Sequence, residues 1–388
     1  MIIGFDGKRA VFNNTGLGNY SRLVIDVLSE FYPKNHYYIY SPKAKENPEL
    51  TALLSRGRVH LKLPRKAPLG GAWWRSVSGM MAEAQRHHVQ LFHGLSGELP
   101  LNIAKSGIPS VLTIHDLIFK RFPKYYKPID RAIYDFKFKH ACRDATRIMA
   151  ISECTKREIM HFYNVPEEKI DVVYQGCNEI FRQPATDFMR QAAADRYRLP
   201  KRYILSVGTV EERKNVLLAV KALEHIADKD VRLVIVGHHT RYYKEILKYA
   251  SAHGLGHRIF AISHIRTEYL PALYQMAEAF VYPSRFEGFG IPILEALCSG
   301  TPVVAATGSC LEEAGGPDTL YVDPDSVEQM TDALNRVLGD DSLRSRMIEA
   351  GHRYSQRFAA STMASQIMDV YERALKQAGG GSVSGPQR

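Results

Sequence analysis

The second half of the chain alternates short apolar runs with segments of helical periodicity, and this alternation constrains the fold most. Residues 231–237 (VRLVIVG) are apolar at nearly every position, as in a strand buried on both faces. Residues 216–226 repeat their apolar side chains with the period of a helix. Such alternation predicts a doubly wound α/β domain with a parallel sheet and with ligands at the carboxyl ends of its strands.

The same pattern recurs along the whole chain, less regularly in the first half. In the second half we predict strands at 203–208, 231–237, 258–262, 280–282, 301–306 and 320–322, and helices at 216–226, 243–252, 269–277 and 291–299. In the first half we predict strands at 2–5, 37–40, 59–63, 91–93, 110–114, 147–151 and 170–173, and helices at 18–30, 129–145 and 152–162.

A chain of 388 residues exceeds what one hydrophobic core usually supports, which favours two domains. Regular patterning fades around residues 176–184, so we place the first domain at 1–180 and the second at 181–359. Residues 360–377 predict an amphipathic helix after the second domain. The Gly- and Ser-rich residues 378–388 predict a flexible tail.

The composition is that of an ordinary soluble protein, with 45% apolar and 24% charged residues. No uninterrupted apolar run reaches the roughly 18–20 residues that span a bilayer. The first residues read as a strand and lack the features of a signal peptide. The five cysteines form no C-x-x-C pair, so neither a zinc site nor a redox motif is supported. We expect a cytoplasmic, reduced location and no metal or cofactor.

The net charge of +10 belongs mostly to the first half of the chain. Residues 1–180 contain 26 Lys and Arg against 17 Asp and Glu, whereas the remainder contains 25 against 24. This excess indicates either an anionic partner, such as phospholipid headgroups or a lipid pyrophosphate, or only a soluble basic surface. No nucleic-acid module is recognisable, so we expect no nucleic acid. Peripheral contact with the inner face of the cytoplasmic membrane stays an open interpretation.

An aromatic and apolar patch, Trp73-Trp74-Arg75 with Met80-Met81, lies in this basic half. Buried core is one interpretation. A surface that faces an acceptor or a membrane is the other.

Two carboxylates, Glu287 and Glu295, lie eight residues apart in the segment SRFEGFGIPILEA (284–296). The segment follows an apolar run that predicts a strand, passes through a glycine-rich loop, and enters a helix with Pro292 in its first turn. Loop N–H groups and a helix N-terminus both favour anions. A solvated helix face is the alternative for an isolated pair of this spacing.

Two adjacent cations, Arg213 and Lys214, follow the first strand of the second domain in VGTVEERKN (207–215). A solvated basic pair is the simpler interpretation of two cations. Their place at the carboxyl end of a strand, before a helix, favours a clamp for pyrophosphate instead.

His115 follows the predicted strand 110–114, which favours a functional over a structural histidine, and Asp116 either orients it or caps the next turn. The sequence TGLGNYS (15–21) approaches the G-x-G-x-x-G pattern but ends in Ser21, so it is weak evidence for dinucleotide binding. The triplet Asp323-Pro324-Asp325 could suggest a metal site. Its position favours a helix cap by Asp325 or Ser326.

These motifs, followed by GTPVVA (300–305), resemble the donor-sugar motif of glycosyltransferase family 4, also called glycosyl transferases group 1. The resemblance covers about residues 1–375 and is strongest from 203 to 325. It implies the GT-B fold, in which two Rossmann-like domains face each other across a cleft, and a retaining glycosyl transfer. It also implies that the terminal helix crosses back to the first domain.

The resemblance also implies roles for individual residues. Arg213 and Lys214 would bind the donor diphosphate and do the work of a metal ion, and Glu295 would bind the ribose. Glu287 and the N–H groups of Phe289 and Gly290 would hold sugar hydroxyls, and His115 would lie near the reacting sugar. The further donor-binding residues implied are Gly16, Gly18, Ser206, Gly208, Arg285, Phe286 and Gly288.

The opening IGFDGKR (3–9) is similar to mannosyltransferases that build bacterial surface polysaccharide. This favours GDP-mannose as donor, with UDP-sugars close behind, and a glycan or lipid-linked acceptor. Three other classes stay open: a sugar-nucleotide 2-epimerase of the same architecture, a phosphorylase with a pyridoxal lysine, and a non-catalytic nucleotide-sugar-binding module.

Overall fold

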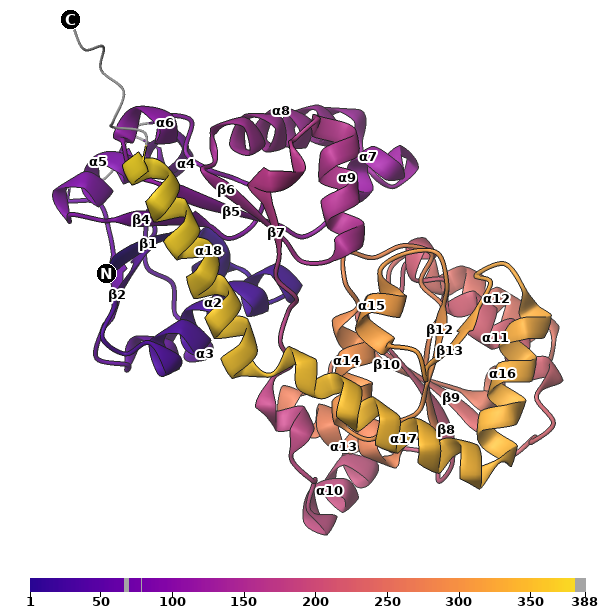
Figure 1. Ribbon diagram of the computed structural model, residues 1–388. Coiled ribbons are helices and arrows are strands. Elements are labelled where there is room, and N and C mark those ends of the chain that lie inside the picture. Colours follow the sequence, from indigo (N-terminus) through magenta and orange to yellow (C-terminus); the bar gives the residue numbers. More distant parts are fainter. Residues whose placement is uncertain (66–69, 78, 381–388) are drawn as a thin grey trace, which may run out of the picture. The chain divides into compact units, whose positions relative to one another are not determined.

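The computed structural model describes residues 1–65, 70–77 and 79–380, which divide into two compact units. Unit 1 contains Met1–Gln175 and the segment from Ala360 on, and unit 2 is Gly176–Ala359. Each unit has its own sheet with helices on both faces (Figure 1). All strand pairs in both sheets are parallel, so the prediction of two doubly wound α/β sheets is confirmed.

The sheet of unit 1 has the strand order β3-β2-β1-β4-β5-β6-β7. Successive strands are added on one side of β1 up to β3 and on its other side from β4 on, so the order reverses between β1 and β4 while all strands stay parallel. Every strand predicted for this half is present within one residue at each end. The strands are β1 (Ile2–Asp6), β2 (His36–Tyr40), β3 (Val59–Lys62), β4 (Leu91–Gly94), β5 (Ser110–Ile114), β6 (Arg147–Ala150) and β7 (Ile170–Val172).

The three helices predicted in this half are present, and several short helices were not predicted. Helices of four to eight residues make about one or two turns, too few to establish a period. The helices are α1 (Lys8–Phe12), α2 (Gly16–Phe31), α3 (Pro48–Leu54), α4 (Gly71–Ser76), α5 (Gly79–Arg86), α6 (Ile103–Ser106), α7 (Ile118–Arg121), α8 (Pro128–Asp144), α9 (Glu153–Tyr163) and α18 (Ala360–Gly380), with 3-10 turns η1 (Pro123–Tyr125) and η2 (Glu167–Lys169).

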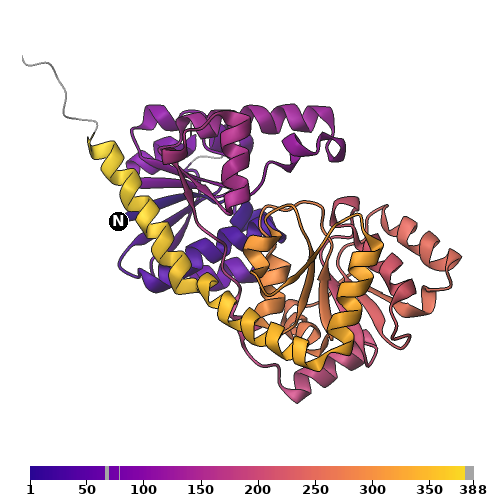
Figure 2. The same cartoon turned by 45° about the vertical axis from the view of Figure 1, so that its right-hand side comes forward.

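The C-terminal helix α18 belongs to unit 1, where it packs on α2, β5 and β6. Figure 2 shows it in yellow beside the sheet of that unit. Its apolar side chains are buried, and Tyr371 is fully inaccessible. The helix runs three residues beyond the predicted end at 377, and residues 381–388 of the predicted tail lie outside the described residues.

The sheet of unit 2 has the order β10-β9-β8-β11-β12-β13 and reverses between β8 and β11. Its strands are β8 (Tyr203–Val207), β9 (Arg232–Val236), β10 (Ile259–Ile262), β11 (Ala279–Tyr282), β12 (Val303–Ala306) and β13 (Leu320–Val322). Its helices are α10 (Asp187–Tyr197), α11 (Val216–His225), α12 (Tyr243–Ala252), α13 (Leu270–Met276), α14 (Ile291–Cys298), α15 (Leu311–Gly315), α16 (Val327–Gly339) and α17 (Asp341–Ser355), with 3-10 turns η3 (Glu179–Arg182), η4 (Glu212–Lys214), η5 (Gly256–Arg258), η6 (Thr267–Tyr269) and η7 (Gln356–Phe358).

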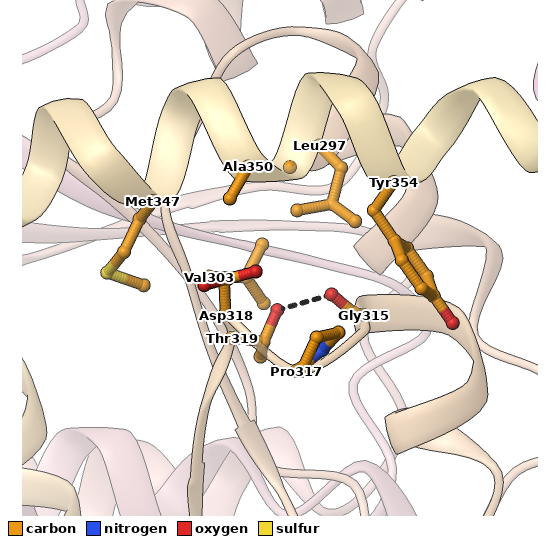
Figure 3. A pocket seen from close by; sticks show the side chains of 10 residues that line it. Leu297, Val303, Gly315, Pro317, Asp318, Thr319, Met347, Ala350 and Tyr354 are labelled. Carbon is orange, nitrogen blue, oxygen red and sulfur yellow. Dashed lines mark hydrogen bonds between the residues drawn. The ribbon is translucent and has the colours of Figure 1, made fainter.

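The contact between α14 and α17 is closely packed. Figure 3 shows Ala350 and Tyr354 of α17 facing Leu297 of α14, with Thr319 donating a hydrogen bond of 2.8 Å to the carbonyl oxygen of Gly315. These side chains leave no room for a water molecule. This contact therefore holds α14 in place and offers no space for a ligand.

The aromatic patch of the basic half is divided by the structure. The Trp74 side chain is buried, with 7% of its surface exposed, whereas Trp73 is 64% exposed. One tryptophan thus belongs to the core and the other faces outward. In the described part of the chain, no helix is long and apolar enough to cross a membrane.

A buried polar chain links α18 to the sheet of unit 1. His93 in β4 lies 2.7 Å from the Tyr371 hydroxyl through Nδ1 and 2.8 Å from the Thr113 hydroxyl through Nε2. Burial lowers the pKa of His93 to about 3, so the ring is neutral and depends on these two partners.

We predict that Tyr371→Phe lowers the free energy of unfolding of unit 1 by about 1–3 kcal/mol, because it leaves a buried ring nitrogen without a partner. Both tryptophans lie in unit 1, so denaturation followed by tryptophan fluorescence reports this change. Tyr163→Phe, in the same unit, removes a hydrogen bond of 3.1 Å to Asp135, which keeps Lys120 as a partner. It is the matched control and should cost less than about 1 kcal/mol. Equal losses in the two variants would contradict the prediction.

Candidate functional site

Two loops meet where the strand order of unit 2 reverses, which is the position where open parallel sheets bind ligands. One loop follows β8 and contains η4. The other follows β11 and leads into α14. The Arg285 N–H donates to the carbonyl oxygen of Arg213 at 2.9 Å, and the Ser284 hydroxyl lies 3.3 Å from the same oxygen. The backbone thus joins the two predicted motifs directly.

A buried ion cluster lies between these loops. Glu287 Oε2 is 2.9 Å from an Arg213 guanidinium nitrogen, and Glu287 Oε1 is 2.6 Å from Lys214 Nζ. The three side chains are only 11–15% exposed. Burial raises the pKa of Glu287, but the charges of Lys214 and Arg213 outweigh burial and lower the pKa to about 2. Glu287 is therefore ionised at neutral pH.

Two hydroxyl groups complete the environment of Glu287. Ser284 donates to Oε1 at 2.6 Å, and Tyr282 donates to the same oxygen at 3.1 Å. With the two cations, Glu287 has four donors, about as many as a carboxylate accepts. A sugar hydroxyl could bind Glu287 only by replacing one of them. In this structure Glu287 is the counter-ion that orients Arg213 and Lys214.

The Arg213 guanidinium also donates to Glu211 Oε1 at 2.7 Å and to the Phe286 carbonyl oxygen at 2.6 Å. Lys214 Nζ also contacts the Tyr282 hydroxyl and lies 4.9 Å from the centre of that ring. Two cations and two carboxylates make the cluster neutral overall. Any anion that binds the two cations would therefore compete with Glu211 and Glu287.

The loop before α14 depends on Gly290, whose φ is +119°. A Cβ there would lie 3.1 Å from the Leu311 side chain. A larger residue would therefore be strained both by its backbone conformation and by this close contact. The Cys310 thiol lies 3.1 and 3.0 Å from the carbonyl oxygens of Glu287 and Phe289. No side chain caps the start of α14. Pro292 has no N–H, and the Ile293 N–H donates to the Gly290 carbonyl oxygen at 2.9 Å, so the donor that this first turn can offer to an anion is the Ile291 N–H.

Glu295 lies one turn further along α14, in an environment opposite to that of Glu287. Among the described residues, the Tyr274 hydroxyl is its hydrogen-bond donor, at 2.8 Å from Oε2. Burial raises the pKa of Glu295 to about 7, and the hydrogen bond opposes this only partly. Glu295 thus has an oxygen to offer to a further donor, such as a hydroxyl.

The remaining residues of the predicted donor site in unit 2 lie around this cluster. Ser206 is buried in β8, and Gly208 directly follows this strand beside the Lys214 side chain. Phe286 and Gly288 are buried in the loop after β11. Arg285 forms an ion pair of 2.7 Å with Asp325.

The Asp323-Pro324-Asp325 triplet is used within the fold. The Ser326 hydroxyl caps α16 by accepting the Gln329 N–H at 3.1 Å, which confirms the predicted cap. Asp323 accepts the Asp325 N–H at 2.8 Å. The described residues contain no group of His, Cys, Asp and Glu arranged to hold a metal ion.

His115 lies in unit 1, directly after β5. Its Nε2 is 2.9 Å from the Leu95 carbonyl oxygen, which can only accept, so Nε2 carries the proton. Burial lowers the pKa of His115 to about 4, against the opposing effect of this hydrogen bond. The ring is neutral, and Nδ1 is an acceptor 3.4 Å from the Gln175 amide nitrogen. Tyr20 contacts the ring edge-on with centres 4.5 Å apart.

Gly16 and Gly18 begin α2, the helix that carries Tyr20. Gly16 is exposed and its surroundings are open. A Cβ on Gly18 would lie 1.8 Å from the Asn13 carbonyl oxygen, so this glycine permits a close backbone approach. The Gly18 N–H already donates to the Thr15 carbonyl oxygen and the Asn13 side chain. The fold itself therefore accounts for a glycine at this position, and no ligand is needed to explain it.

The residues that sequence reasoning missed are the partners of the predicted ones. Glu211, Tyr282 and Ser284 lie within or beside the predicted motifs, and an excess of two cations over one carboxylate could have suggested a second anion. Tyr274 and Gln175 are distant in sequence from Glu295 and His115, and no local pattern marks them. His115, Gly16 and Gly18 belong to unit 1, and the other predicted site residues gather in unit 2.

We predict that stability falls between about pH 4.5 and 7 through Glu295, because the folded protein keeps a proton that the unfolded chain releases. A raised carboxyl pKa stabilises the fold below its unfolded value, and this stabilisation is lost as pH rises through the folded value. Glu295→Gln should remove this fall, which amounts to about 3 kcal/mol. Denaturation at several pH values measures it.

The matched control for this prediction is Glu349→Gln, on the exposed surface of α17, which should keep the pH profile of the wild type. Parallel profiles for Glu295→Gln and the wild type would show that the proton is not held by Glu295.

Most of the chain matches two models of glycosyltransferase families. Residues 190–354 match the family model of glycosyl transferases group 1, and residues 22–179 match the model of glycosyltransferase family 4. The first range contains the ion cluster and Glu295, and the second contains His115. The two matches therefore cover both units and every predicted site residue except Gly16 and Gly18.

Individual relatives agree with the family models. The chain is 29% identical over 290 residues to the O-antigen chain mannosyltransferase B of Escherichia coli, covering 73% of this chain and 74% of that protein. It is 28% identical over 296 residues to the MMP alpha-(1->4)-mannosyltransferase of Mycolicibacterium hassiacum, covering 71% and 68%.

The fold also matches a solved structure, that of Anabaena HepE in complex with UDP and glucose, with a TM-score of 0.73 and 18% identity over 96% of this chain and 99% of that one. At this identity the likeness shows the fold alone, which is the GT-B fold. The motifs, the two family models and the fold agree, and the chain belongs to glycosyltransferase family 4, the glycosyl transferases group 1.

Proposed function

We propose that this glycosyltransferase is a retaining mannosyltransferase, which moves mannose from GDP-mannose to a glycan or lipid-linked acceptor in the synthesis of a surface polysaccharide. The observation that carries this proposal is the Arg213–Lys214–Glu287 cluster at the reversal point of the sheet. Two oriented cations at the carboxyl ends of parallel strands suit a nucleoside diphosphate.

The donor would bind across the loops of unit 2. Its diphosphate would take Arg213 and Lys214 as partners, with the Ile291 N–H at the start of α14. Its ribose would donate a hydroxyl to Glu295, whose second oxygen is on offer. Its sugar would contact the N–H groups of Phe289 and Gly290, and a sugar hydroxyl would contact Glu287 by replacing one of its four donors. The other residues proposed to line this site are Ser206, Gly208, Arg285, Phe286 and Gly288.

Unit 1 would supply the remaining contacts, with His115 near the sugar and with Gly16 and Gly18 near the phosphate. The neutral ring of His115 presents Nδ1 as an acceptor, which suits a sugar hydroxyl better than a phosphate oxygen. Gly16, exposed and in open space, fits the proposed phosphate contact more readily than Gly18 does.

The transfer would retain the anomeric configuration. The acceptor oxygen would attack the anomeric carbon on the face from which the phosphate leaves, through an oxocarbenium-like state. The bond from that carbon to the phosphate oxygen breaks, and the leaving phosphate takes the acceptor proton. Arg213 and Lys214 would balance the charge that grows on the nucleotide, so the protein acts by positioning and charge stabilisation.

The identity of the donor rests on the relatives. The two relatives described above are named mannosyltransferases, which favours GDP-mannose, whereas the Anabaena structure holds UDP and glucose, which keeps UDP-sugars as the second candidates. The sugar transfer would take place on the cytoplasmic side of the cytoplasmic membrane, with the protein in peripheral contact with the inner face of that membrane.

A sugar-nucleotide 2-epimerase of the same fold is the alternative enzyme, and a non-catalytic nucleotide-sugar-binding module is the alternative to an enzyme. Incubation with donor alone separates the first alternative, because an epimerase converts the donor without an acceptor. If Glu287→Ala and Lys214→Ala leave the biological output unchanged, catalysis is the wrong account and the non-catalytic module is favoured.

We predict that GDP-mannose raises the melting temperature more than GDP-glucose, UDP-glucose or UDP-galactose, since ligand binding stabilises the folded state by about 2.7 kcal/mol at a hundredfold excess over Kd. Arg213→Ala should abolish this shift. Arg202→Ala, which removes an exposed arginine of unit 2, is the control and should keep it. A larger shift of the melting temperature with a UDP-sugar would contradict GDP-mannose as the donor and favour that UDP-sugar.

We predict that Glu287→Gln and Glu295→Gln affect different kinetic constants with GDP-mannose and a short mannoside acceptor. Glu287→Gln should lower kcat about a hundredfold, because it disorders the cations that face the leaving group. Glu295→Gln should raise the donor KM about tenfold with kcat nearly unchanged, because it removes a ribose contact. Glu349→Gln is the control. Equal effects of both variants on both constants would undo this division.

A further inference from the structure

The helix α8 carries apolar side chains on two sides, and the fold accounts for only one. On the inner side, Tyr134 and Phe138 pack against Phe119 and the core of unit 1. On the outer side, Ile129, Ile133 and Phe136 are 74%, 46% and 63% exposed. Their spacing of four and three residues places them in one stripe along the helix.

The segment around this stripe is strongly basic. Residues 120–143 contain eight Lys and Arg and two Asp, so they account for +6 of the net charge of +10. Asp135 is neutralised by Lys120, at 2.8 Å. Among the described residues no ion pair is found for Lys127, Arg131 or Lys139. Lys127 and Lys139 are exposed, and Arg131 is half-buried.

A cavity of about 440 Å³ opens at the C-terminal end of the stripe. Phe136, Tyr163 and Pro166 form part of its wall, and Lys139 and Arg143 line it as well. Lys169, also in the wall, donates to the carbonyl oxygens of Cys142 and Arg143 at 2.9 Å each. Arg143 is paired with Asp144 at 2.6 Å. The cavity therefore combines an apolar wall with a surplus of positive charge.

We propose that the outer face of α8 docks on an anionic phospholipid bilayer. Ile129, Ile133 and Phe136 would enter the boundary between headgroups and acyl chains, and the cavity beside Lys139 would hold a headgroup phosphate. Aliphatic and aromatic side chains in line between cations are the pattern of a helix that lies in a membrane interface. A nucleic acid would bind the cations through its phosphates, but it would make no contact that explains the exposed isoleucines.

This inference names the residues of the membrane contact in the proposed function, yet it rests on unit 1 alone. Binding to vesicles needs neither donor nor acceptor. A protein that transfers sugar to a soluble acceptor but ignores vesicles would overturn only the docking proposal. A protein that binds vesicles but transfers nothing would overturn only the proposed function.

The test is co-sedimentation of the full chain with vesicles of phosphatidylglycerol and phosphatidylcholine, compared with pure phosphatidylcholine. We expect binding only to the anionic vesicles and a decrease with added salt. Lys127→Gln with Lys139→Gln should weaken binding about 25-fold, since each charge near the surface contributes about fivefold. Failure of the wild type to prefer anionic vesicles overturns the proposal, whatever protein or nucleic acid it binds instead.

The apolar stripe has a matched control elsewhere in the chain. Phe136→Ser should weaken vesicle binding about tenfold or more, whereas Phe188→Ser, which changes a phenylalanine of unit 2 that is 79% exposed, should not change it. Unchanged melting temperatures and unchanged transfer to a soluble acceptor would show that all variants are folded. Equal losses for Phe136→Ser and Phe188→Ser overturn the role of the stripe.

Discussion

The organisation of unit 2 depends on one buried ion cluster, in which Glu287 lies between Arg213 and Lys214. Parallel pairing of β8 with β11 places the two loops that carry these residues side by side. Loss of one member would leave an uncompensated charge out of water, which costs several kcal/mol. The surrounding groups, Ser284 and Tyr282 among them, hold the cluster in a single geometry, and Gly290 allows the loop to turn into α14.

The two carboxylates of one motif have opposite properties. Glu287 has a pKa of about 2 because two cations adjoin it, and Glu295 has a pKa of about 7 because it is buried with only a tyrosine hydroxyl. At neutral pH the first is fully charged and the second is about half protonated. Two carboxyl groups whose surroundings give them very different pKa values can serve different functions in one site. This difference supports the proposal that Glu287 mainly balances charge and that Glu295 binds a hydroxyl.

Unit 1 combines two features on separate elements. One is a neutral histidine, His115, held by Leu95, Tyr20 and Gln175 after β5. The other is the basic outer face of α8. Gln175 is the last residue of unit 1 before the chain enters unit 2, so the environment of His115 includes a point where the chain crosses between units. Tyr371 of α18 is linked to the surroundings of His115 through His93 and Thr113, because the Thr113 hydroxyl lies 3.2 Å from the hydroxyl of Tyr20.

Local patterns were enough to predict the class of fold and the position of the motifs, because buried parallel strands and their glycine-rich loops are visible in stretches such as residues 231–237 and 284–296. The sequence also placed Arg213 and Lys214 in the site. The packing of distant residues, by contrast, makes Glu287 the counter-ion of these cations, raises the pKa of Glu295 through burial, and leaves α8 with a second apolar face. These properties depend on distance and solvent exclusion between residues far apart in sequence, such as Tyr274 and Glu295, which no local pattern encodes.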